Sequence, residues 1–357
     1  MLQTLPHTRE RIRTEVDLLL LLWRVLVNTQ GLAEGEPLLT RARVLCEPLG
    51  DTPQLFWVLY LLQIFYRGRE EHQTARECAE QALTLAQRLQ DPALSLSAHG
   101  ALGLTLLTLG DQTAARGHFE QALARYDAGI GVLVRGHTVQ ALSHLAHTLW
   151  LLGYPDQAVQ RNHEALSLER EPPTYPVSHY LALYDASTLH QLRREVHAVH
   201  AQTEAAIALA SEEGTSRFLP RMLHRRGWVL AVQGQYEAGI AQMSQALTTL
   251  RAAGAVGWVD PSALSQLAEA YGQSRRVEEG LSLLAEARAA VEHTGARFWE
   301  AEVQRLTGDL LLRQAVPDEE QAETCFQQAL DVARRQQAKS LELRAAMSLA
   351  KLWQSQN

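Results

Sequence analysis

Two pairs of histidines are the first residues whose spacing could support chemistry. His144 and His147 are three residues apart, as are His197 and His200, so each pair would share one face of a helix. A zinc site needs three or four ligands, and no HExxH motif, cysteine or carboxylate completes either set. We therefore expect no metal and no other cofactor, and we expect these histidines to be solvated or to line a groove.

Other catalytic patterns are also missing. The sequence has no G-x-S-x-G turn, and its only lysines, Lys339 and Lys351, exclude a phosphate-binding G-x-x-x-x-G-K-[ST] loop. The glycines of residues 129–136 do not follow a predicted strand, as a dinucleotide-binding motif requires. Paired carboxylates at 278–279 and 319–320 begin predicted helices, where they interact favourably with the helix dipole. We predict that the chain is not an enzyme.

The composition favours helices and a reducing compartment. Alanine and leucine dominate the 357 residues, whereas aromatic residues make up 6%. A net charge of −7 argues against nucleic acid or an anionic membrane as the main partner. The most apolar run, residues 16–27, is too short to span a bilayer. Cys46, Cys78 and Cys325 form no CxxC motif and suit helix interfaces, so we expect a cytoplasmic protein.

A repeat of small residues organises the chain. Gly239 is followed seven residues later by Ala246, and the spacing of a small residue and then [Gln/Glu/Arg]-Ala recurs seven more times. Successive copies are 40 to 43 residues apart, a period typical of stacked helix pairs. Two small residues seven apart share one helix face and allow a neighbouring helix to approach closely. The second alanines of the eight copies are Ala42, Ala82, Ala122, Ala165, Ala205, Ala246, Ala287 and Ala329.

The repeat predicts an all-α, right-handed α-solenoid superhelix of about eight helix-turn-helix repeats. We expect a lead-in over residues 1–9, a helix pair over 10–50, seven regular repeats over 51–337 and a capping helix over 339–354. The regular repeats are predicted as the pairs 54–68 and 71–89, 92–109 and 112–127, 136–152 and 155–170, 177–192 and 195–213, 217–233 and 236–253, 261–274 and 277–294, and 297–313 and 318–337.

Two further positions are diagnostic within each pair. We call the small residue that begins each copy of the repeat motif the small landmark. Gly110, Gly153 and Gly234 lie five residues before it, where the turn needs a positive φ. Arg193 and Arg275 stand at the matching places, so we expect those two turns to close differently. The first helix also carries a small residue twelve positions before the landmark in five repeats, and Gly308 fits this rule if its turn is two residues longer; the five residues are Gly103, Ala146, Ala186, Gly227 and Ala268.

These small residues resemble those of the tetratricopeptide repeat (TPR), although the period is about 40 residues instead of 34. Several segments are more specifically similar to the C-terminal TPR region of large bacterial signalling proteins that join a class III adenylate/guanylate cyclase, or a similar module, to an ATPase. No cyclase or ATPase segment is present, so the resemblance implies either a region of a longer protein or a stand-alone protein. The segments are residues 151–158, 190–195, 226–228, 267–272, 298–302 and, most strongly, 325–353.

The first helix of each pair is expected to line the concave face of the solenoid. Positions 2, 5, 9 and 12 of these helices, counted from the small landmark, are rich in aromatic residues, histidine and arginine, which are favoured at binding hot spots. Some of the aromatic residues could instead pack between helices. The predicted partner-binding residues are Trp57, Tyr60, Arg67, Gln140, His147, Trp150, Tyr180, His190, Arg221, His224, Trp228 and Glu269.

Two functions remain open from the sequence. The concave face of the solenoid could make the chain a protein- or peptide-binding scaffold or regulatory module, with a cyclase or ATPase signalling module as a candidate partner. Alternatively, the chain could sense a small molecule or peptide and regulate an attached or separate ATPase or cyclase. The oligomeric state and the ligand do not follow from the sequence.

Overall fold

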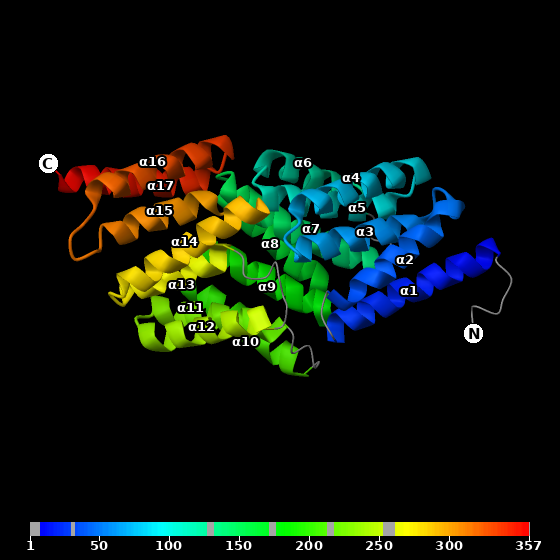
Figure 1. The fold of residues 1–357 in the computed structure, drawn as a ribbon, viewed down its shortest axis with the longest axis horizontal. Helices are drawn as coiled ribbons and strands as arrows, with labels where there is room; N and C mark the ends of the chain where they lie inside the picture. The colour runs from blue at the N-terminus through cyan, green and yellow to red at the C-terminus, as the bar shows by residue number, and fades with distance from the viewer. Residues whose placement is uncertain are drawn as a thin grey trace.

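The computed structural model describes residues 8–29, 33–126, 132–170, 176–212, 218–252 and 261–356, and all regular elements in these ranges are helices (Figure 1). The predicted lead-in therefore lies almost wholly outside the described residues, as do residues 129–131. The elements are α1 (Arg9–Thr29), η2 (Ala33–Gly35), α2 (Glu36–Cys46), η3 (Glu47–Leu49), α3 (Pro53–Gly68), α4 (His72–Leu89), α5 (Pro92–Leu109), α6 (Gln112–Leu123), α7 (Val132–Leu151), α8 (Pro155–Arg170), α9 (Pro176–Leu192), α10 (Val196–Glu212), α11 (Leu219–Val232), α12 (Tyr236–Ala252), α13 (Pro261–Gln273), α14 (Val277–Thr294), α15 (Glu300–Leu311), α16 (Glu319–Arg335) and α17 (Lys339–Ser355).

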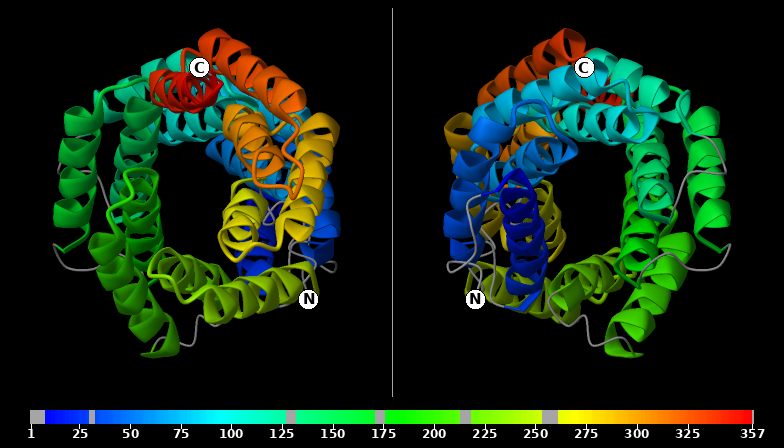
Figure 2. Two further views of the ribbon diagram at one scale, coloured as in Figure 1. Left: turned by 90° about the vertical axis from the view of Figure 1, so that its left-hand side faces the viewer. Right: turned by 90° about the vertical axis from the view of Figure 1, so that its right-hand side faces the viewer.

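The helices form a two-layered, right-handed α-solenoid, as predicted. Each odd-numbered helix packs antiparallel on the even-numbered helix that follows it, and most consecutive odd-numbered helices also contact each other. The odd-numbered helices therefore occupy the inner, tighter layer of the superhelix. Viewed end-on, the ribbon forms a ring around a central axis (Figure 2). The predicted bounds of residues 92–109 and 277–294 agree with those of α5 and α14.

The superhelix closes on itself after about one turn, because its last repeats return to its middle repeats (Figure 2). The Phe298 amide donates to the Thr108 carbonyl at 3.2 Å. The Thr113 hydroxyl donates to the side chain of Gln337 at 2.9 Å, and the Ser340 hydroxyl donates to the Trp150 carbonyl. These hydrogen bonds join residues up to 224 positions apart and fix the curvature of the inner layer.

The small residues of the repeat are buried between helices, as expected. A Cβ atom on Gly103 would lie 2.8 Å from the Phe119 ring, and one on Gly308 would lie 2.5 Å from the Phe326 ring. Phe119 and Phe326 each follow their landmark by four residues, so Gly308 is the equivalent of Gly103 despite its longer turn. Any larger side chain at these glycines would have to displace an aromatic ring.

One repeat departs from the predicted register. In α10 the buried residues include Val199 and Ala206, whereas Ala198 is half-buried and the predicted alanine Ala205 is exposed. The interface of this repeat is therefore shifted by one residue toward the C-terminus. The prediction of Ala205 was wrong because Ala198 and Ala205 have the expected size and spacing, but the turn before them is one residue later.

The turns containing arginine close in the same way as those containing glycine, contrary to our expectation. Gly110, Gly153 and Gly234 have φ of 87° to 89°, and the non-glycine residues Arg275 and Arg194 also have positive φ, at 64° and 61°. The prediction of Arg193 for this turn was wrong by one residue, because the turn lies one residue later. A backbone hydrogen bond of 2.8–2.9 Å spans all five turns, for example from the amide of Arg276 to the carbonyl of Tyr271. This bond offsets the cost of about 1 kcal/mol for a left-handed non-glycine residue.

Helix α5 is the one described helix that is long and apolar enough to cross a bilayer. Of that stretch, 67% is buried inside the solenoid, and the core helix of a folded domain meets the same criteria. This helix is therefore weak evidence for a membrane span. Cys46, Cys78 and Cys325 are also buried as free thiols in the helix interfaces, as expected.

Candidate partner-binding site

The inner layer holds an aromatic patch, which we define as Trp57 and Tyr60 of α3 with His137 of α7. All three side chains are partly exposed. The Trp57 and Tyr60 rings meet edge-to-face with centroids 5.4 Å apart, and the Tyr60 and His137 rings lie 5.2 Å apart. Burial raises the pKa of Tyr60 to about 12 and lowers the pKa of His137 to about 4. The patch is therefore uncharged at neutral pH, and part of its aromatic surface is accessible.

Next to this patch lies a group of charged residues that we call the arginine cluster: Arg67 of α3, Asp185 of α9, and Arg221 and Arg225 of α11. Burial raises the pKa of Asp185 to about 7, and the positive charges of Arg225, Arg221 and Arg67 oppose this rise. His144 Nε2 lies 3.8 Å from Asp185 Oδ2, and His147 Nε2 lies 2.8 Å from the Asp185 carbonyl. Four inner helices therefore converge on one carboxyl group that is only part-ionised at neutral pH.

Two guanidinium groups of this cluster have no carboxylate partner among the described residues. Arg67 forms no ion pair within 4 Å, and its Nε is buried without a hydrogen-bond partner. Arg225 donates to the Gln191 side chain and, at 3.0 Å, to the Thr188 hydroxyl, both of which are neutral. The ring of Tyr184 lies 5.1 Å from the Arg225 guanidinium. Burial lowers the pKa of Arg67, which nevertheless remains a cation.

A second charged group, which we call the clasp, consists of Arg194, Glu269, Glu302, Arg305, Asp309 and Arg344. Glu302, with 1% of its side chain exposed, accepts from Arg305 at 2.8 and 2.9 Å and from Arg344 at 3.0 Å. Arg305 also pairs with Asp309, and Arg194 donates to both oxygens of Glu269 at 2.8 and 3.1 Å. Although burial raises the pKa of Glu302, the two arginines hold it at about 2. Each arginine of the clasp therefore has a carboxylate partner.

The twelve predicted partner-binding residues fall into two groups. Trp57, Tyr60, Arg67, Gln140, His190, Arg221 and Glu269 are partly exposed. His147, Trp150, Tyr180, His224 and Trp228 are 0–9% exposed and pack between helices. Tyr180, for example, is fully buried, and its hydroxyl donates to the Phe218 carbonyl at 2.8 Å.

Several of these residues are engaged in holding the solenoid together. The Trp150 ring lies 5.3 Å from the Arg344 guanidinium, and the Trp228 ring lies 5.9 Å from that of Arg194. His190 Nδ1 lies 2.6 Å from a carboxylate oxygen of Glu195. The inner positions thus divide between structural contacts and the accessible surface around Trp57 and Arg67.

The register shift in α9 and α10 explains why the sequence missed part of the arginine cluster. Counting from Val199 instead of Ala198 replaces Tyr180 and His190 by residues that surround Arg225. The one signal for Asp185 in the sequence was an acidic residue within an otherwise largely apolar helix. The residues gained by the corrected count are Leu181, Tyr184, Thr188 and Gln191.

The histidine pairs do not form a metal centre in the part of the chain that the structure describes, where no group of three or more His, Cys, Asp or Glu side chains is arranged to hold an ion. His144 and His147 lie against Asp185 of the arginine cluster, and burial lowers the pKa of both histidines. His197 and His200 are exposed on α10.

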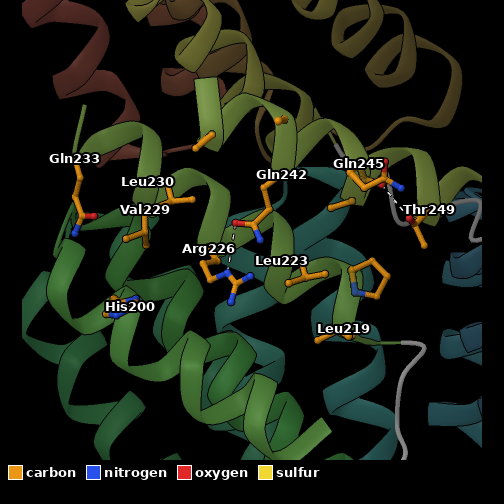
Figure 3. A pocket seen from close by; sticks show the side chains of 14 residues that line it. His200, Leu219, Leu223, Arg226, Val229, Leu230, Gln233, Gln242, Gln245 and Thr249 are labelled. Atoms are coloured by element: carbon orange, nitrogen blue, oxygen red, sulfur yellow. Dashed lines mark hydrogen bonds between the residues drawn. The ribbon is translucent and has the colours of Figure 1, made fainter. Parts of the chain in front are cut away.

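The outer side of α11 carries a separate, largely apolar groove of about 830 Å³ between α10 and α12 (Figure 3). Leu219, Leu223 and Leu230 point into it, and Arg226 at its wall donates to Gln242 at 3.4 Å. Arg225 and Arg226 are adjacent in sequence but lie on different sides of α11. This helix therefore contributes to both the inner arginine cluster and the outer groove.

Comparisons with known proteins support this fold. Residues 64–128 match the family model described as tetratricopeptide repeat, and no curated protein sequence matches the chain. A Rap protein complexed with Competence and Sporulation Factor is 13% identical, with 92% of this chain and 99% of that chain covered and a TM-score of 0.61. The apo form of RapI is 12% identical; the alignment covers 79% of this chain and 98% of that chain, with a TM-score of 0.53.

A third solved structure is that of the APC/C hetero-tetramer Cut9-Hcn1, which is 16% identical with a TM-score of 0.59. The alignment covers 94% of this chain but 55% of that chain, so this chain spans about half the length of its Cut9-Hcn1 counterpart. At these identities the similarity shows the fold alone. The chain is therefore a TPR-like α-solenoid in which residues 64–128 are recognisable tetratricopeptide repeats.

Proposed function

We propose that the chain is a non-enzymatic interaction module that binds a protein or peptide segment on the inner face of its superhelix. The observation that carries this proposal is the aromatic patch, whose rings are partly exposed beside the unpaired Arg67. Aromatic residues and arginine contribute most to binding energy at protein interfaces, because they bury large areas and keep a polar group available. The Rap protein that shares this fold was crystallised with Competence and Sporulation Factor, which supports a binding role for such a solenoid.

The proposal is tested by selecting binders from a displayed library of random heptapeptides. We expect selected peptides to bind the wild-type protein and to bind the variant Trp57→Ala at least tenfold more weakly, about 1.4 kcal/mol. Trp353→Ala is the matched control, because Trp353 is an exposed tryptophan near the C-terminal end of α17, where its indole donates to Glu323 of α16. Equal binding to wild type and Trp57→Ala would place the ligand elsewhere.

A narrower proposal concerns the partner. The six segments that resemble the TPR regions of cyclase–ATPase proteins support a cytoplasmic signalling module of that kind as the partner. Co-purification of the chain with such a module, lost in Trp57→Ala and kept in Trp353→Ala, is the expected result. Retention of the module by both variants would argue against the inner face as its docking site.

An effector-sensing role is the second candidate, and the clasp favours it. The clasp joins the turn after α9, which adjoins the arginine cluster, to α15 and α17, so a ligand at the inner face could change the closure of the ring. We expect a small effector to raise the melting temperature of the chain at micromolar concentration. A screen of nucleotides, sugars and peptides that shifts nothing would contradict this role.

A further inference from the structure

We propose that the arginine cluster is an anion site, in which Arg67 and Arg225 receive a carboxylate or phosphate group of the ligand. The inference rests on the proposed function, since it assigns the chemistry of a ligand bound on the same inner face. It goes beyond that function because it states which group of the ligand is recognised and where.

The first support is the absence of a counter-ion where one is expected. Arg67 and Arg225 form no ion pair within the described residues, although Arg225 is 6% exposed. Burying a cation without a partner is costly, so a folded chain normally supplies a carboxylate. The clasp follows this rule, since Arg305 and Arg344 both pair with Glu302. Arg67 and Arg225 do not follow it within the described residues.

The second support is that Asp185 does not neutralise the cluster. Within the described residues its carboxylate forms no ion pair with Arg67 or Arg225, and the titratable side chain that lies against it is His144, at 3.8 Å. His147 and Tyr180 also lie near Asp185; burial lowers the pKa of His147 to about 4 and raises the pKa of Tyr180, so neither side chain is charged at pH 7. An incoming anion would therefore meet an excess of positive charge.

The third support is the orientation of the guanidinium groups. Arg225 is held by Gln191, Thr188 and the Tyr184 ring, and Gln191 is in turn held by Gln266 at 3.1 Å. These contacts come from α9 and α13, so the group is fixed before a ligand arrives. The buried Nε of Arg67 has no acceptor. Pre-organised arginines of this kind suit planar carboxylate and tetrahedral phosphate groups.

The surroundings also restrict the rest of the ligand. Helices α9 and α11 approach each other less closely than most consecutive odd-numbered helices, and Tyr184 and Thr188 of α9 reach Arg225 of α11 across this space. Tyr60 and Trp57 of the aromatic patch lie along α3 from Arg67, about two and three turns toward the N-terminus. We expect the anionic group to be accompanied by an aromatic or aliphatic residue that contacts Trp57 and Tyr60.

The test is isothermal titration of the wild-type protein with inorganic phosphate and with glutarate at constant ionic strength. We expect both anions to bind, and Arg67→Gln to weaken both by at least tenfold. Arg225→Gln should have the same effect. If this variant does not fold, Arg67→Gln alone still tests the site, because Arg67 is partly exposed and its substitution disturbs the core less. Arg226→Gln is the matched control on the outer side of α11, and it should bind as wild type does.

Peptides distinguish the source of the anionic group. Three versions of a selected heptapeptide are compared: one with an internal glutamate and an amidated end, one neutral with a free C-terminal carboxylate, and one with a phosphoserine. The version that loses affinity for Arg67→Gln identifies the group. Phosphate and glutarate affinities that are equal in wild type and Arg67→Gln would overturn the anion site. Peptides that depend on Trp57 but not on Arg67 would also overturn it, while the proposed function would stand.

Discussion

The clasp and the arginine cluster of this solenoid differ in how their arginines are partnered. In the clasp, three arginines meet three carboxylates, and hydrogen bonds of about 3 Å connect them. In the arginine cluster, Arg67 and Arg225 face one carboxyl group with which they form no ion pair. A saturated charge network holds helices together, whereas an unsaturated one retains binding capacity. The same residue type therefore closes the ring at one place and remains available for a ligand at another.

Acidification should produce the largest difference in stability between the region of the arginine cluster and the clasp. Burial lowers the pKa of His137 and His147 to about 4 and of His224 to about 3, below the ordinary 6.5, and it lowers that of His144 as well. The unfolded chain binds these protons first, so stability is present above pH 6.5 and is lost as pH falls toward 4. Four such histidines imply a loss on the order of 5 kcal/mol by pH 5.

This loss should begin around α7, α9 and α11, because the pKa of Glu302 in the clasp stays near 2. Hydrogen exchange at pH 7.5 and pH 5 would show it as earlier loss of protection in α7 than in α15. Equal loss of protection in the two helices would mean that the arginine cluster and the clasp lose stability equally on acidification.

The next largest effect is expected from Glu302→Gln. This change leaves Arg305 and Arg344 buried without a full counter-charge, and removal of one partner from a buried ion pair costs about 3–5 kcal/mol. Urea unfolding measures the change. The control Glu300→Gln is on the same helix as Glu302 and removes an ion pair with the exposed Arg297. This change should cost less than about 1 kcal/mol. Similar costs for the two variants would show that the clasp is not a buried network.

The corresponding change in the arginine cluster, Asp185→Asn, should act in the opposite direction. The pKa of Asp185 is about 7 in the folded chain against an ordinary 3.8, so wild-type stability falls as pH rises through this range. The variant removes this dependence and should be more stable than wild type by about 2 kcal/mol at pH 8, with a smaller gain at pH 5. Asp309→Asn in the clasp should destabilise at both values. A loss of stability in Asp185→Asn at pH 8 would contradict the account.

The smallest energetic effect is expected from Arg194→Gln. Arg194 and Glu269 are 39% and 23% exposed, so their ion pair contributes less than about 1 kcal/mol. The pair nevertheless joins the turn after α9 to α13, and its loss should loosen the ring. Small-angle scattering should show a larger radius of gyration for this variant than for Arg193→Gln. An unchanged radius would mean that the other clasp contacts suffice for closure.

The sequence predicted the fold well because the fold depends on local spacing. Small residues such as Gly103 and Ala246 report helix packing within one repeat, and the turn glycines report a local backbone conformation. The one error of register, at Ala205, arose because two adjacent residues had suitable sizes and the turn residue Arg194 gave no glycine signal.

The charged groups could be predicted only in part. Arg67 and Arg221 follow from their helix positions, but the pairing of Arg344 with the Leu192 carbonyl joins residues 152 positions apart. Such contacts depend on small rotations that accumulate over many repeats, and single-residue spacing does not record them. For the same reason Asp185 was missed, since its role depends on three other helices.

The most direct test of the central claim observes both groups in one sample. In protein labelled with ¹⁵N-arginine, the Nε–H signals of Arg67 and Arg305 are assigned by substitution and followed while inorganic phosphate is added at constant ionic strength. We predict a saturable shift of the Arg67 signal and no shift of the Arg305 signal, because Arg305 is already paired. An Arg67 signal that does not move, or that moves no more than that of Arg305, would contradict the claim.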